Sequence, residues 1–366
     1  MKNTTRILIL ILTGCVTLPL LATLGFTIFH KEKVFDLKAA PPEKIISLLE
    51  RTLDRHQSVF LSPEYYPAIP AQDLKGLPSL IESKKAMSDV SNFYRLHRER
   101  HFTLLVFGTF PDSIAMVTNL TDSPLWILSG VSPWGFILVP NISTTTKTPI
   151  WSPPSQEALT QEYPNATQRS EWLIATAENL ISIGRMGAAE ELLQSATATG
   201  KCIASLHGAQ ASLAAAQGRW NDALRMARQA HGEDSRNTAA TEILSRALIE
   251  CGHPDEGLDV ARKLTDQLKN QETLFLLARA ANAANSKAEE IEALRSLVGM
   301  ARTQHQLLGA SLTYLGQAYA RNGERGEAIR SFREAVSQRE LTTEQRLLLR
   351  GMIEHLSPEG LVPTKN

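Results

Sequence analysis

Cysteine is scarce in this chain, because its 366 residues include only Cys15, Cys202 and Cys251 and no Cys-x-x-Cys pair. Three cysteines cannot build a disulfide framework. Excess charge is also lacking, since 38 Lys and Arg balance 38 Asp and Glu. A net charge of zero argues against a protein that binds nucleic acid through a basic surface.

Enzyme signatures are missing too. The sequence has no Gly-x-Ser-x-Gly, no P-loop and no Gly-x-Gly-x-x-Gly after a strand. His97 and His101 have the i, i+4 spacing of a helical zinc site, but Glu99 is on the wrong side for a zincin and no third ligand is evident nearby. We therefore expect no catalysis, cofactor or metal, and interpret this pair as a solvated, basic helix end.

The longest apolar run is at the start, where 7–29 contains no charge. A helix of that length spans the ~30 Å hydrocarbon layer of a bilayer, and a secretory apolar core is usually only ~7–15 residues. We predict that 1–33 is a retained, single-pass signal anchor, with the bulk of the chain on the exported (periplasmic or extracytoplasmic) side. Two alternatives stay open: lipidation of Cys15, which ends a Leu-Thr-Gly-Cys lipobox, and cleavage after a small residue.

Residues 34–140 are predicted to form a small α+β domain of two helices and a four-stranded antiparallel meander. Helical spacing covers about 41–56 and 79–100, the second opening with a capping box. The strands are expected at 102–107, 113–119, 125–129 and 136–139. The first strand is apolar on both faces, so one face needs a further cover: a second copy in a homodimer, the C-terminal half or a partner. Residues 141–169, rich in Thr, Ser and Pro, are expected to be an extended linker.

Internal repetition dominates the C-terminal half. A helix, a turn and a second helix recur, with the turn at Gly184, Gly218, Gly252, Asn285 and Gly323, at intervals of 34, 34, 33 and 38 residues. The last copy carries the most complete pattern, with Leu312, Leu315, Gly316, Tyr319, Gly323, Ala328, Phe332 and Ala335. Small residues at these positions let paired helices approach closely, and the large ones fill the space between them.

This pattern resembles the tetratricopeptide repeat (TPR) family over roughly 170–356. The resemblance implies an α-solenoid of about five helix pairs, closed by a capping helix that opens at Thr342, with a tail at 357–366. Two residues depart from the family pattern: Gly257, where alanine is expected, and Glu290 in the fourth copy.

The TPR resemblance implies a protein-interaction scaffold whose concave face is lined by the first helix of each repeat. The inward positions give a candidate protein-binding groove of Glu178, Glu242, Arg246, Phe275, Arg279, Asn282 and Gln317. Arg246 and Arg279 occupy equivalent positions in adjacent repeats and are suited to gripping a carboxylate or an acidic peptide. The alternative is that they pair with Glu242, Glu250 or Glu272 on a solvated face.

The sequence as a whole predicts a mainly α, membrane-anchored TPR scaffold or adaptor that binds other proteins and assembles an envelope complex. Two other functions stay open. One is a periplasmic lipoprotein adaptor held by Cys15, and the other is an enzyme with an active site in 34–150 that the repeats regulate.

Overall fold

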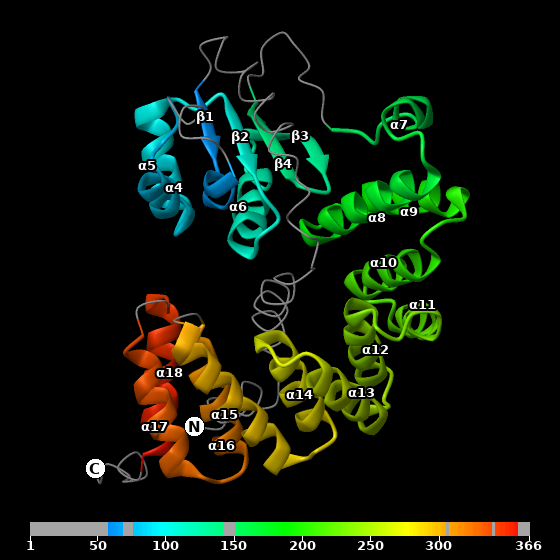
Figure 1. Cartoon of the computed structure of the whole chain (residues 1–366). Coiled ribbons are helices and arrows are strands. Elements are labelled where there is room, and N and C mark those ends of the chain that lie inside the picture. Colours follow the sequence, from blue (N-terminus) through cyan, green and yellow to red (C-terminus); the bar gives the residue numbers. More distant parts are fainter. Residues whose placement is uncertain (1–57, 69–75, 142–150, 305–306, 339–340, 358–366) are drawn as a thin grey trace. The chain divides into compact units, whose positions relative to one another are not determined.

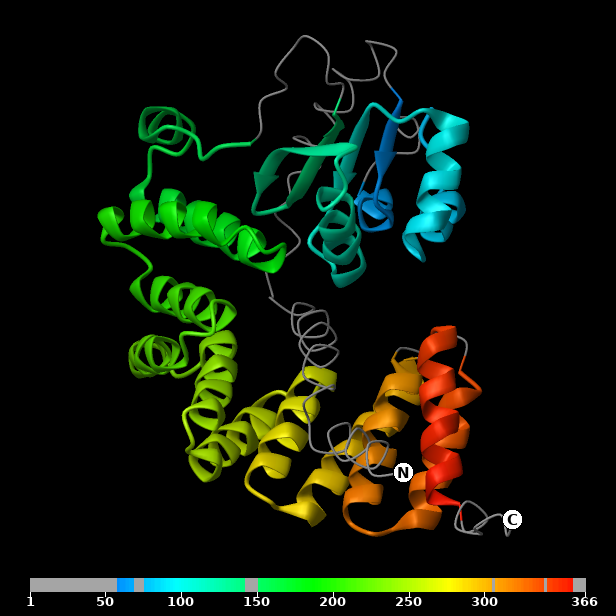
Figure 2. The same cartoon turned by 180° about the vertical axis from the view of Figure 1, so that it is seen from behind.

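The computed structural model describes residues 58–68, 76–141, 151–304, 307–338 and 341–357 (Figure 1, and from behind in Figure 2). Two compact units make up the chain, Met1–Gln217 (unit 1) and Gly218–Asn366 (unit 2). No helix within the described residues is long and apolar enough to cross a membrane. The apolar run 7–29, with Cys15, and the helix predicted at 41–56 lie outside the described residues.

Unit 1 contains a four-stranded mixed sheet. Its strands are β1 (Val59–Leu61), β2 (Leu104–Phe107), β3 (Trp126–Ser132) and β4 (Gly135–Pro140). They lie in the order β1-β2-β4-β3, with β1 parallel to β2 and the other neighbours antiparallel. Because parallel neighbours need a crossover, the chain runs from β1 to β2 through a 3-10 helix, η2 (Pro63–Ala68), and the helices α4 (Leu80–Met87) and α5 (Val90–Arg100).

The predicted antiparallel meander is therefore wrong, although four strands are present. Residues 113–119 belong to a helix, α6 (Pro111–Thr121), instead of a strand. Pro111 stands at the first helical position, where its missing N–H has no intrahelical partner to lose, so it begins a helix where the sequence suggested a turn. The strand that the sequence analysis missed is β1, whose three residues are too few to show an alternating pattern.

The helix predicted over 79–100 is two helices. The predicted capping box begins α4, because the Ser79 hydroxyl accepts from the Glu82 N–H and the Glu82 carboxylate accepts from the Ser79 N–H. Asp89 then begins α5, since its carboxylate accepts a hydrogen bond from the Ser91 N–H at 3.1 Å. The crossover between the parallel strands thus has two helical segments.

Both faces of the sheet are buried within unit 1. Alternate residues of β1, β2 and β4 fill one face, which α5 and α6 cover: Phe60, Leu105, Phe107, Phe136 and Leu138. The residues between them point to the opposite face: Val59, Leu61, Leu104 and Val106. Tyr65, Tyr66 and Leu77, which follow β1, pack on this second face. The homodimer predicted through this sheet stays a prediction.

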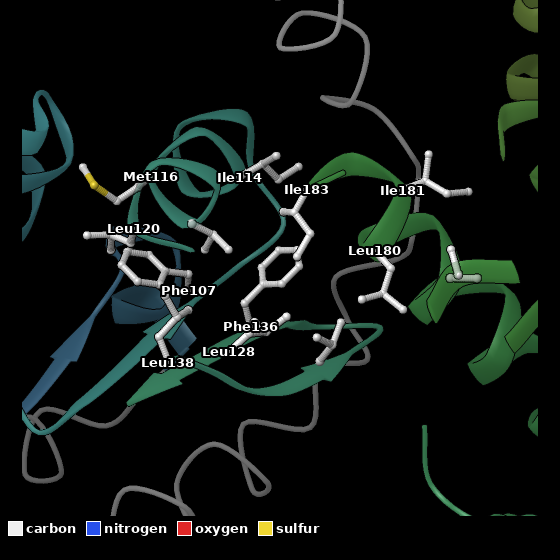
Figure 3. Packing of buried hydrophobic residues seen from close by; sticks show 14 of the residues in the cluster. Phe107, Ile114, Met116, Leu120, Leu128, Phe136, Leu138, Leu180, Ile181 and Ile183 are labelled. Carbon is white, nitrogen blue, oxygen red and sulfur yellow. The ribbon is translucent and has the colours of Figure 1, made fainter. Parts of the chain in front are cut away.

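The first helix of the repeat half shares the core of the sheet. α8 (Ala166–Ser182) ends at Ile183, whose side chain lies in the same buried cluster as Phe136 of β4 (Figure 3). At the same end of α8, Asn179 Nδ2 donates a hydrogen bond to the Ser132 carbonyl at 2.8 Å. The cover over the first face of the sheet therefore includes α8 of the repeat half.

Part of the segment predicted as a linker packs against these elements. The Trp151 N–H donates to the Leu128 carbonyl of β3 at 2.9 Å. The short helix α7 (Gln156–Glu162) buries Leu159, and Tyr163 packs against Trp172 of α8 with ring centroids 6.1 Å apart. Residues after 150 thus connect to both the sheet and α8.

Helix pairs form the remainder of both units. In unit 1, α8 pairs with α9 (Met186–Thr199), and α10 (Ile203–Ala216) packs on both. Unit 2 contains α11 (Trp220–Glu233), α12 (Thr238–Glu250), α13 (Pro254–Gln267), α14 (Gln271–Ala283), α15 (Lys287–Gln304), α16 (Leu308–Arg321), α17 (Arg325–Val336) and α18 (Thr343–Leu356). Each helix of unit 2 packs on the next, and α12 also lies beside α14. This succession of helix hairpins is TPR-like.

The backbone confirms the predicted turn positions. Gly184, Gly218, Gly252, Asn285 and Gly323 all have positive φ, from 56° to 85°. Glycine adopts this left-handed conformation without strain, and asparagine tolerates it better than most residues. A Cβ built on any of these four glycines would meet nothing within 4 Å, so the constraint is conformational and not steric.

We expect Gly252→Ala to lower the free energy of unfolding by about 1–2 kcal/mol, which is the cost of the left-handed region for a residue with a Cβ. Gly299→Ala is the matched control, because Gly299 lies inside α15 with open space around its Cβ and a right-handed backbone. It should be neutral or stabilising. Urea unfolding followed by far-UV circular dichroism measures both; equal effects at the two positions would contradict the assignment of the turn.

Close approach of paired helices explains Gly257. In the last repeat, a Cβ added to Gly316 would lie 2.5 Å from Cε1 of Phe332. In the third repeat the equivalent residue is Ser245, whose hydroxyl donates to the Gly257 carbonyl at 2.8 Å, and a Cβ added to Gly257 would lie 2.8 Å from Cγ1 of Ile249. A larger residue on one helix is thus matched by a smaller one on its partner.

The fourth repeat accommodates a longer interval and a buried acid. α15 has 18 residues where α13 has 14, so the 38-residue interval adds about one helical turn. Glu290 is 6% exposed and forms an ion pair with Arg321 of α16. Burial raises the pKa of Glu290, and Arg321 opposes that rise.

The final helix, α18, opens with the capping box of Thr342 and Gln345. Leu349 is buried, whereas Leu347 and Leu348 are exposed. The outer side of this terminal helix is therefore polar with two leucines among the polar residues.

Candidate protein-binding site

Charged and aromatic side chains from three alternate helices gather in unit 2. This arginine cluster comprises Glu242, Arg246 and Glu250 of α12, Phe275 and Arg279 of α14, and Tyr314 of α16. Residues four apart share one face of a helix, so Glu242, Arg246 and Glu250 lie in a row on α12. Arg279 stands 33 residues after Arg246, and this interval of one repeat places it on the equivalent face of α14.

Ion pairs connect the members of the cluster. Arg279 Nη2 lies 2.6 Å from Glu250 Oε1 and joins α14 to α12, while Arg246 Nη1 lies 3.6 Å from Glu242 Oε1. Burial lowers the pKa of Arg279, the neighbouring Arg246 lowers it further, and Glu250 and Glu242 oppose the change. The pairing with Glu242 and Glu250 that the sequence left as an alternative is what the structure contains.

An aromatic pair adjoins the arginines. The rings of Phe275 and Tyr314 lie 4.9 Å apart between their centroids, and Phe275 is buried. Burial raises the pKa of Tyr314 to about 12, and the charge of Arg279 opposes the rise. The Tyr314 hydroxyl forms no hydrogen bond with the residues that the structure describes. Tyr314 as a whole is half-buried.

Sequence reasoning missed Tyr314 because the helical spacing of four residues back from Gln317 places the inward position at Thr313. The Thr313 hydroxyl donates to the Gly309 carbonyl at 2.7 Å and is satisfied within its own helix. Tyr314, the next residue, is the one whose ring contacts Phe275 of α14. An aromatic residue next to the expected position was the available signal.

The other predicted site residues are not part of the arginine cluster. Asn282 is exposed near the end of α14, and Gln317 is half-buried on α16. Glu178 is half-buried on α8, in unit 1. Of the seven predicted residues, the contacts bring together Glu242, Arg246, Phe275 and Arg279, with Glu250 and Tyr314 added.

The end of α5 is basic and exposed at Arg98, Arg100 and His101, as the sequence suggested, but His97 is half-buried. His97 packs among aromatic rings, with centroids 5.0 Å from Trp126 and 5.9 Å from Phe102, whereas His101 is exposed in a left-handed conformation. His97 Nδ1 and Trp126 Nε1 are buried and hydrogen-bond to nothing in the described part of the chain. Among the described residues, no three His, Cys, Asp or Glu side chains are placed to hold a metal ion.

We expect His97 to make the stability of unit 1 depend on pH. Burial, and secondarily His101, lower the pKa of His97, so the unfolded chain takes up its proton at a higher pH than the folded chain. Stability should therefore fall as the pH drops below about 6.5. His97→Phe is expected to flatten this dependence between about pH 7 and pH 5 in urea unfolding, while His101→Asn keeps most of it. An unchanged slope in His97→Phe would refute the assignment.

A half-buried carboxylate, that of Glu64, lies at the carboxyl ends of the parallel strands. Glu64 Oε1 accepts a hydrogen bond from the Ser113 hydroxyl at 2.5 Å, in the first turn of α6. The N-cap residue Phe110 offers this helix no side-chain acceptor, so Glu64 supplies the negative charge that a helix N-terminus favours. Burial raises the pKa of Glu64. Ser113 is 1% exposed and out of reach of a substrate, so we interpret the pair as a structural contact.

Comparison with known proteins finds distant structural similarity. No family model and no curated protein matches the sequence. A thermophilic TPR protein from Thermus thermophilus is 15% identical, with a TM-score of 0.41 over 49% of this chain and 96% of that one. YrrB, a TPR protein with an unusual peptide-binding site, is 14% identical, with a TM-score of 0.41 over 53% of this chain and 96% of that one. MamA from Desulfovibrio magneticus is 13% identical, with a TM-score of 0.41 over 47% of this chain and 95% of that one.

Proposed function

We propose that this chain is a membrane-tethered scaffold that binds protein partners through the arginine cluster and carries out no catalysis itself. The observation that supports this proposal is that arginine, glutamate and aromatic side chains from α12, α14 and α16 lie together. Arginine and tyrosine are the residue types that dominate the energetics of protein interfaces. A stack of helix pairs presents such residues at regular spacing, which suits an extended polypeptide partner.

The membrane part of the proposal rests on sequence. The uncharged run 7–29 has the length of a membrane span, and the short basic segment before it suits a signal anchor with the repeats on the exported side. Assembly of an envelope complex is the role that this placement favours. Should Cys15→Ala release the protein from the membrane, the anchor would be a lipid on Cys15 instead of a helix.

Charge reversal tests the binding face. We expect Arg246→Glu with Arg279→Glu, in the full-length chain, to reduce crosslinked capture of its partners by at least about tenfold, because each arginine would present the wrong charge. Arg228→Glu with Arg333→Glu is the matched control, since both residues are exposed on other helices, α11 and α17. Equal capture by the two double variants, with unchanged helicity, would remove the arginine cluster from the proposed function.

A further inference from the structure

We propose that Glu250 occupies the guanidinium of Arg279 as an internal substitute for a carboxylate of the partner, and that the partner segment is acidic. This inference rests on the proposed function and identifies the chemistry of its ligand. Binding would exchange one carboxylate for another on Arg279 and would place the partner segment beside Tyr314.

The Arg279–Glu250 contact is suited to exchange. Arg279 donates one hydrogen bond, to Glu250, among the residues that the structure describes, although a guanidinium has five N–H donors. The two side chains retain 34% and 31% exposure, so solvent and ligand reach the pair.

Arg262, another arginine of unit 2, makes more hydrogen bonds to carboxylates than Arg279 does. Arg262 binds Glu289 through two hydrogen bonds of 2.7 Å and Asp259 through a third of 2.6 Å. A fork held by three bonds to two carboxylates has little capacity for a further anion. Arg279, with a single bond, has unused donors.

The charges around Arg279 favour an anion over a cation. Arg246 lies close enough to act on it electrostatically, and the two glutamates of the cluster do not fully offset the burial of its charge. A further carboxylate would compensate the partial burial of Arg279, whereas a cationic ligand would have to take Glu250 from Arg279 and leave this half-buried cation without its carboxylate.

The aromatic pair gives the ligand a second point of contact. Tyr314 supplies a hydroxyl without a partner in the described structure and a ring that packs on Phe275. A carboxylate on Arg279 with an apolar or aromatic side chain next to it in sequence would satisfy both features. The inferred ligand is thus an acidic segment that also carries apolar residues.

Binding of fluorescein-labelled poly-L-glutamate to the full-length protein in detergent, followed by anisotropy at low salt, tests this assignment. Glu250→Gln should tighten binding by about tenfold, because it removes the competing carboxylate, and Arg279→Gln should weaken it by about tenfold. Glu256→Gln is the matched control: it removes the same charge from α13, where Glu256 pairs with exposed Arg228, and should change binding less than about twofold.

The gain in Glu250→Gln is decisive when far-UV circular dichroism shows unchanged helicity, since loss of the folded site would weaken specific binding. The proposal would be overturned if Glu250→Gln and Glu256→Gln bound poly-L-glutamate with equal affinity. It would also be overturned if the unmodified protein bound poly-L-lysine and Glu250→Gln abolished that binding. Either result leaves the proposed function standing if charge reversal at Arg246 and Arg279 still prevents partner capture. The proposed function itself would fail separately, if charge reversal at Arg246 and Arg279 left partner capture unchanged.

Discussion

Replacing Phe136 with alanine is expected to lower the free energy of unfolding of unit 1 by about 3–5 kcal/mol, the range for deleting a buried aromatic ring. Phe136 is 1% exposed and belongs to a cluster that contains residues of the sheet, α6 and α8 (Figure 3). The cavity would open where Ile183 meets the hairpin of β3 and β4. Urea unfolding monitored by tryptophan fluorescence reports on this region, because Trp126 belongs to the same cluster and Trp151 packs against it.

Ile137→Ala is the matched control for this experiment. Ile137 is the next residue on β4 but faces the opposite side of the sheet, where it is only partly buried. We expect it to cost about 1–2 kcal/mol, below the range for a fully buried isoleucine. A Phe136→Ala effect no larger than that of Ile137→Ala would show that α8 and the sheet do not share one core.

Removing Arg321 should produce the second large effect, about 3 kcal/mol for Arg321→Ala. This value is at the low end for breaking a buried ion pair, because the side chain of Glu290 is buried while that of Arg321 retains 39% exposure. Without Arg321, the carboxylate of Glu290 stays buried on α15 without its cation. Since burial raises the pKa of Glu290 in the folded state, protonation relieves the loss, and the deficit should shrink as the pH falls toward about 4.5.

Glu290→Ala provides the comparison, because alanine stands at the equivalent positions Ala189, Ala223 and Ala328. It should change the free energy of unfolding by less than about 1 kcal/mol, since the exposed Arg321 returns to solvent. The double variant should then match Glu290→Ala alone. Additive losses in the double variant would contradict the account of a buried acid that needs its cation.

The repeat half could be predicted well because its constraints are local and recur. A turn between two helices needs a positive φ, which explains glycine at four of the five turns and asparagine at Asn285. Position 257 shows the limit of this reasoning. Gly257 departs from the family pattern because Ile249 and the Ser245 carbonyl on the facing helix leave no room for a Cβ, and this crowding appears only when both helices are placed.

The sheet was harder to predict because its strands are short and buried on both faces. An apolar run without alternation does not distinguish a strand from a helix, and this ambiguity misassigned α6. The contact of α8 with the β3–β4 hairpin involves Ile183 and Asn179, which lie outside the inward positions of the repeat pattern. No periodicity within the repeats indicates such a contact.

For the binding site, the repeat period identified Arg246 and Arg279, and the structure adds their partners. Glu250 was considered only as a neutralising neighbour, whereas its single bond to Arg279 makes it a competitor for ligand in our proposal. Tyr314 lies one position from the expected inward residue. A helix face is wider than one residue per turn, so adjacent positions can reach a neighbouring helix.

The most direct test of the central claim is site-specific photocrosslinking in cells. A photoreactive amino acid at Asn282, exposed on α14 three residues after Arg279, is compared with one at Lys263, exposed on α13. The scaffold account predicts a discrete adduct with a partner protein from position 282, lost in Arg246→Glu with Arg279→Glu, and none from position 263. An adduct from position 263 alone, or the same adduct from both positions, would contradict it.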